Sequence, residues 1–120
     1  MIIWIRSLEL AGRFSATAIR VPTTNVSAMD ITILTTRATT VAGVNEVLRA
    51  ASLGSLAGIL GYTEEPLASC DFNHDRHSSI VDAGQTSLSG DRLLKVFTWF
   101  DNEWGFANRM LEVSQIMMRG

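Results

Sequence analysis

The 120-residue chain is 47% hydrophobic and has a formal net charge of −2, with 10 Lys and Arg against 12 Asp and Glu. It is long enough to bury one core of ordinary size, and without a basic run it offers no electrostatic reason to bind nucleic acid or an anionic membrane surface. The apolar stretch Met1–Ile5 ends at Arg6 and is too short for a signal-peptide core or a membrane span.

Strands and a helix are predicted in the first half of the chain. Residues alternate between apolar and polar faces from Ser15 to Val21, and again from Ser27 to Arg37, which is typical of β-strands. Thr40 is expected to cap a helix that Gly54 closes.

The second half is predicted to hold a short strand at Pro66–Phe72, a polar loop at Asn73–Ser78 and another strand that begins at Ser79–Asp82. Leu93–Phe100 is rich in branched and aromatic residues and is predicted to be a strand, followed by a final helix over Asn102–Met118.

Four apolar residues recur at helical spacing in the final helix, and we expect them to face the core: Phe106, Met110, Val113 and Met117. The order of elements, with alternating rather than continuously apolar strands, predicts an α+β fold. Its sheet should be mainly antiparallel and covered by helices on one face.

Two polar residues stand out as candidate ligand-binding residues. Arg20 shares a strand face with Ala16 and Ala18, which leaves room around a guanidinium that suits carboxylate or phosphate; the alternative is a strand-edge arginine paired with an acidic neighbour. Asn102 lies where the last strand becomes the last helix. It either caps that helix or offers its side-chain amide to a planar, amide-bearing ligand. No glycine-rich phosphate loop occurs in the chain.

Metal binding and cysteine chemistry are not favoured. The acidic residues from Asp71 to Asp82 have the spacing of a calcium loop, but Arg76 stands where that loop needs glycine. His74 and His77 lack a clear third ligand. Cys70, the single cysteine, excludes an internal disulfide, is expected to be unreactive, and fits a reducing, cytoplasmic compartment.

Four segments carry a resemblance to a known family: AIRVPTTNV (18–26), GILGYTE (58–64), DFNHDRHS (71–78) and WFDNEWGFANRM (99–110). Together they resemble the C-terminal part of the catalytic domain of the glyceraldehyde-3-phosphate dehydrogenase family. Residues 73–75 and 104–110 are most similar to its erythrose-4-phosphate dehydrogenase branch. Residues 12–120 are thus assigned to that domain, and residues 1–11 are an atypical N-terminal segment.

The resemblance implies a mixed sheet, a homotetrameric complete enzyme and the cofactor NAD. Family members oxidise a phosphorylated sugar aldehyde through a cysteine thiohemiacetal. In the erythrose branch water releases 4-phosphoerythronate for pyridoxal phosphate synthesis, and in the glycolytic branch inorganic phosphate takes the acyl group. Arg20 matches the arginine that binds substrate phosphate, and Asn102 matches the asparagine that binds the nicotinamide carboxamide. Phe106 stands where many members carry tyrosine.

The same resemblance implies that catalytic residues are absent from this chain. The family's nucleotide-binding domain, its nucleophilic cysteine and the histidine that activates it have no counterpart here, and Cys70 does not match that cysteine. The chain is therefore expected to be an inactive fragment of the dehydrogenase. A non-catalytic oligomerising module and a pseudogene product are the alternatives. The mean hydropathy of +0.19 is high for a small monomer and indicates that another domain or subunit covers part of the apolar surface.

Overall fold

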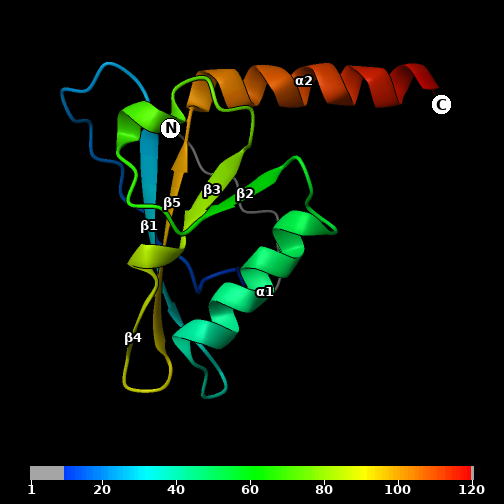
Figure 1. Cartoon of the computed structure of the whole chain (residues 1–120). Helices are drawn as coiled ribbons and strands as arrows, with labels where there is room; N and C mark the ends of the chain where they lie inside the picture. The colour runs from blue at the N-terminus through cyan, green and yellow to red at the C-terminus, as the bar shows by residue number, and fades with distance from the viewer. Residues whose placement is uncertain (1–9, 120) are drawn as a thin grey trace.

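A mixed β-sheet runs through the middle of the molecule (Figure 1). The computed structural model describes residues 10–119, and within them lie five strands: β1 (Ser27–Leu34), β2 (Leu60–Thr63), β3 (Ser79–Asp82), β4 (Ser87–Ser89) and β5 (Leu93–Phe100). Their order is β1-β5-β3-β2, and β4 also pairs with β5. Only β2 and β3 are parallel among these pairings. The predicted α+β fold with a mainly antiparallel mixed sheet is confirmed.

Helix α1 (Val41–Leu53) covers one face of this sheet. Val44 and Leu48 of α1 pack against a buried cluster of Val81, Leu94 and Val96 from β3 and β5. The predicted caps are confirmed, because the Thr40 hydroxyl accepts a hydrogen bond from the Gly43 N–H at 3.1 Å and Gly54 ends the helix. The opposite face of the sheet carries a second cluster built from Val26, Phe72 and Ile80.

Two sequence predictions for local structure are wrong, and one strand was not predicted. Residues 15–21 form no strand, because their alternating pattern finds no partner strand among the described residues. Pro66–Phe72 is not a strand either: it ends in a 3-10 turn at Ser69–Phe72, where the Asp71 carboxylate accepts from the Ala68 N–H at 2.8 Å. Strand β2 was missed because Gly61 breaks the apolar pattern. A Cβ there would lie 2.9 Å from the Ile80 side chain, so the two strands need glycine.

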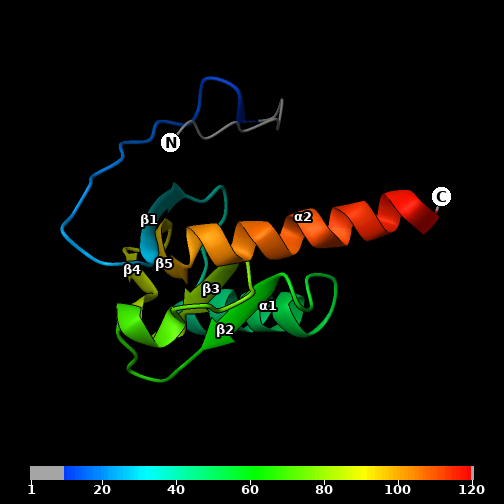
Figure 2. The ribbon, with the colours of Figure 1, turned by 90° about the horizontal axis from the view of Figure 1, so that it is seen from above.

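Helix α2 (Asn102–Arg119) has the predicted bounds within one residue, but its apolar stripe does not face the core. The exposed fractions of the four predicted core residues are high: Phe106 65%, Met110 55%, Val113 55% and Met117 76%. The reason is geometric, since α2 leaves the end of β5 and runs past the sheet (Figures 1 and 2).

The contacts that anchor α2 come from its first two turns. Gly105 is buried against the His77 carbonyl, and the Arg109 guanidinium donates to the Gly58 carbonyl at 3.2 Å. No helix within residues 10–119 combines the length and the apolar character that a membrane crossing requires. The predicted atypical segment 1–11 lies outside the described residues except for its last two.

Candidate functional site

The end of β5, the start of α2 and the turn before β1 meet at one end of the sheet. Ser27 pairs with Phe100, so the residues just before β1 lie beside the residues just after β5. Asp101, which follows Phe100, is only 1% exposed there. Its Oδ1 accepts hydrogen bonds from the N–H groups of Glu103 at 3.2 Å and Trp104 at 2.9 Å. Asp101 therefore caps α2 and places a negative charge at the positive end of the helix dipole.

The second oxygen of the Asp101 carboxylate binds two segments that are distant in sequence. Oδ2 accepts from the Asn25 side-chain amide and from the His74 backbone N–H, each at 2.8 Å. Burial by itself would raise the pKa of Asp101, but the hydrogen bonds from Trp104, His74, Asn25 and Glu103 outweigh it and hold the pKa below its ordinary value. The site thus contains a buried, ionised carboxylate with four donors.

Backbone strain lies next to this carboxylate. Val26 has φ of 70° and His74 has φ of 62°, in the left-handed region that β-branched residues in particular avoid. Val26 is held there by its burial beside Phe72 and Ile80. Such conformations persist only where surrounding contacts impose them, and here they accompany the two segments that bind Asp101.

The two histidines have partners of their own. The His74 ring lies against the Trp104 indole with ring centroids 4.8 Å apart, and His77 Nδ1 is 2.7 Å from an Asp75 carboxylate oxygen. Within the described part of the chain, no group of three or more His, Cys, Asp and Glu side chains is arranged to hold a metal ion. Cys70 is exposed.

Arg20 and Asn102 are both exposed to solvent. Arg20 lies in the irregular segment that leads into β1, not on a strand, and its guanidinium forms no ion pair with any described residue. Asn102 is the first residue of α2. The predicted alternative that Asn102 caps the helix is wrong, because Asp101 does so.

The segments that carry these two residues are joined. Asn25 follows Arg20 by five residues, and its amide binds the carboxylate of Asp101, the residue before Asn102. Sequence reasoning missed both Asn25 and Asp101. An aspartate three residues before Trp104, at the start of a helix, is a usable N-cap signal; the partnership with Asn25, 76 residues away, has no local signal.

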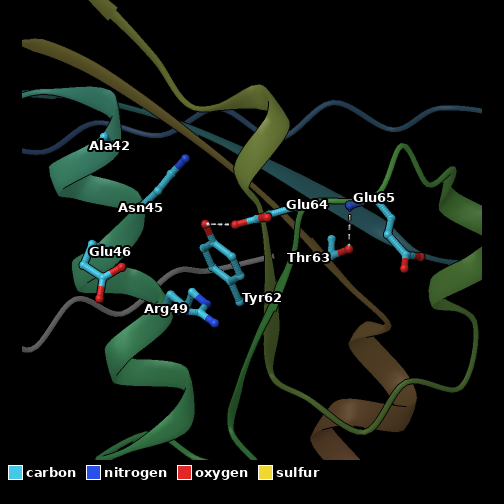
Figure 3. Close-up of a pocket in the computed structure, with 8 residues that line it drawn as sticks. All are labelled: Ala42, Asn45, Glu46, Arg49, Tyr62, Thr63, Glu64 and Glu65. Atoms are coloured by element: carbon cyan, nitrogen blue, oxygen red, sulfur yellow. Dashed lines mark hydrogen bonds between the residues drawn. The ribbon is translucent and has the colours of Figure 1, made fainter.

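A separate groove lies between α1 and β2 (Figure 3). It is open, has a volume of about 700 Å³ and is lined by mostly polar residues: Ala42, Asn45, Glu46, Arg49, Tyr62, Thr63, Glu64 and Glu65. Burial and a hydrogen bond to Glu64 raise the pKa of Tyr62 above its ordinary value. Neither Arg20 nor Asn102 lines this groove, so it is distinct from the site at Asp101.

Comparison with known protein families identifies the domain. A family model described as glyceraldehyde 3-phosphate dehydrogenase, C-terminal domain, matches residues 7–102, which include Arg20, all five strands and Asn102. The chain belongs to this family. The glyceraldehyde 3-phosphate dehydrogenase match confirms the resemblance seen in the four sequence segments, and it implies an oxidoreductase. It identifies the domain without distinguishing one aldehyde substrate from another.

Proposed function

We propose that this chain, over residues 12–120, is the C-terminal part of the catalytic domain of an NAD-dependent dehydrogenase that oxidises D-erythrose 4-phosphate to 4-phosphoerythronate. The observation that carries the proposal is the junction at Asp101, where the segment of Arg20 and the helix start at Asn102 are hydrogen-bonded to one carboxylate. The family supports oxidation of a phosphorylated aldehyde. The choice of erythrose 4-phosphate rests on the similarity of residues 73–75 and 104–110 to that branch.

Arg20 is suited to bind the phosphate of the aldehyde. Its side chain is exposed, and no carboxylate of the described residues is paired with it. A guanidinium presents parallel N–H donors that match two phosphate oxygens.

Asn102 fits the carboxamide of a nicotinamide. Its side chain is exposed in the first turn of α2 and makes no hydrogen bond to another described residue, so that it can both donate to and accept from a planar amide. When bound, NAD would supply the hydride acceptor. The first amides of α2 are already occupied by Asp101, so we expect the pyrophosphate of NAD to be bound by another part of the complete enzyme.

The proposal extends to the assembly, compartment and product of the complete enzyme. We expect the chain alone to be inactive, the complete enzyme to be a cytoplasmic homotetramer and its product to feed pyridoxal phosphate synthesis. Oxidation of glyceraldehyde 3-phosphate is the second candidate, since the family model carries that name. A non-catalytic oligomerising role is the third, and the exposed apolar side chains of α2 favour it.

Complementation tests the proposal. The chain is mixed with a second polypeptide that carries the family's nucleotide-binding domain and nucleophilic cysteine, and NADH formation is followed with each aldehyde. Erythrose 4-phosphate should give the larger kcat/KM. A preference for glyceraldehyde 3-phosphate would select the second candidate, and no NADH from either aldehyde would count against a dehydrogenase role.

A variant pair sharpens this assay. Arg20→Ala should reduce kcat/KM for the phosphorylated aldehyde, whereas Arg13→Ala removes an exposed arginine from the same irregular region and should leave it unchanged. Equal effects of the two substitutions would show a general charge effect and contradict a specific phosphate contact.

A further inference from the structure

Asp101 binds more groups than a helix cap requires. Capping of α2 uses Oδ1, which accepts from Glu103 and Trp104. Oδ2 does not contact α2 at all: it accepts from Asn25, 76 residues away, and from His74, 27 residues away. A carboxylate that served only the helix would leave Oδ2 to solvent. The additional pair of hydrogen bonds therefore calls for a second role.

We propose that Asp101 is a positioning residue that fixes the segment of Arg20 relative to Asn102. One carboxylate holds the start of α2 through Oδ1 and the turn before β1 through Oδ2, so the segment of Arg20 joins the sheet at a point that is tied to the start of α2. The ligands assigned to Arg20 and Asn102 rest on the proposed function. The positioning role of Asp101 rests on its hydrogen bonds and does not depend on those ligands.

The surroundings of Asp101 make this link stiff. Its carboxylate accepts four hydrogen bonds, which is the full capacity of its two oxygens, and Asp101 is 1% exposed, so that water has little access to replace a donor. Asn25 is in turn followed by Val26, whose side chain is buried with Phe72 and Ile80 although its φ is 70°. The turn is thus fixed from both sides: by the carboxylate and by the core.

Asn25 allows the link to be cut without damage to the helix cap. Asn25→Ala removes the donor, and Asn25→Asp replaces it with a carboxylate that repels Asp101. Both leave the Oδ1 bonds to Glu103 and Trp104 in place. Asn73→Ala is the matched control, because Asn73 accepts from the same Asn25 amide but does not contact Asp101.

The test measures the distance between positions 20 and 102 in the full chain. Spin labels are attached to cysteines introduced at these two exposed positions in a Cys70→Ser background, and the distance distribution is recorded by pulsed electron paramagnetic resonance. We expect a narrow distribution in the parent, a broadened one in Asn25→Ala and Asn25→Asp, and no change in Asn73→Ala. A broad parent distribution, or a narrow one that survives both Asn25 substitutions, would overturn the proposal.

A kinetic measurement separates this proposal from the proposed function. In the complemented enzyme, Asn25→Asp should raise KM for NAD and for the aldehyde together, roughly tenfold, with a smaller change in kcat, as the loss of a hydrogen bond to a charged group would give. Complementation without activity would reject the dehydrogenase role and leave the distance result to decide the link. An active enzyme in which Asn25→Asp changes neither KM would reject the positioning role.

Discussion

Removal of the Asp101 side chain tests the central junction most directly. Asp101→Ala deletes the N-cap of α2, which costs about 1 kcal/mol, and two hydrogen bonds from Asn25 and His74 to a charged group, each worth about 1.5 kcal/mol. Because the four donors share one carboxylate, the losses couple, and we expect about 3–4 kcal/mol in total. A domain of 120 residues typically has a free energy of unfolding of about 6–18 kcal/mol, so the variant should still fold.

Urea unfolding followed by circular dichroism measures this loss. The midpoint should fall while the m-value stays constant, because the variant exposes the same surface on unfolding. Asp91→Ala is the control: Asp91 is exposed and makes no side-chain hydrogen bond to another described residue. A loss of about 1 kcal/mol or less for Asp101→Ala would mean that only the helix cap contributes, and would refute the argument for Oδ2.

The pH dependence of the same junction has a definite sign. The folded-state pKa of Asp101 lies below its unfolded value, so the ionised carboxylate stabilises the fold above the unfolded pKa of about 3.9, and this stabilisation is lost as the pH falls through the folded pKa. The free-energy difference between the parent and Asp101→Asn should therefore be largest near pH 7 and shrink below about pH 4. A difference that is constant across this range would contradict the assigned charge.

Four further substitutions test α2 and the ligand-binding residues. Gly105→Ala should lower the stability by about 1–3 kcal/mol in spite of the better helix propensity of alanine, because the new Cβ would lie 2.9 Å from the His77 carbonyl oxygen; an unchanged melting temperature would show that α2 is not held there. In the complemented enzyme, Arg20→Ala should weaken use of the aldehyde by about 2–3 kcal/mol in kcat/KM, and Asn102→Ala should mainly raise KM for NAD; an effect of Asn102→Ala confined to the aldehyde would contradict its assignment. Met110→Lys should leave the melting temperature of the monomer unchanged and reduce self-association measured by light scattering, because Met110 is 55% exposed; a parent that is strictly monomeric would remove the case for an oligomerising face.

Helices and strands that are marked by caps or side-chain patterns within a few neighbouring residues were predictable from the sequence. Thr40 and Gly54 mark the two ends of α1, and the branched and aromatic run Leu93–Phe100 marks β5. In these segments capping chemistry and side-chain pattern agree with the tertiary environment. Asn102 was correctly located at the junction of the last strand and helix for the same reason.

Elements whose form depends on a partner were not predictable. Residues 15–21 have a strand pattern but no strand beside them in the described structure, while Leu60–Thr63 forms a strand around a glycine because β3 lies against it. The periodicity of α2 correctly indicated an apolar stripe, yet its direction relative to the sheet leaves Phe106 and Met117 exposed. Periodicity reports which residues share a face, and only packing decides what that face meets.

The candidate site divides in the same way. The residue types of Arg20 and Asn102, and the family to which they belong, could be read from the sequence, because motifs of a few neighbouring residues carry that information. The contacts of Asp101 could not, since Asn25, His74 and Asp101 are brought together only by the pairing of β1 with β5 and by the loop after Phe72. A hydrogen bond between residues 76 positions apart forms only in the folded tertiary structure, and no pattern of neighbouring residues predicts it.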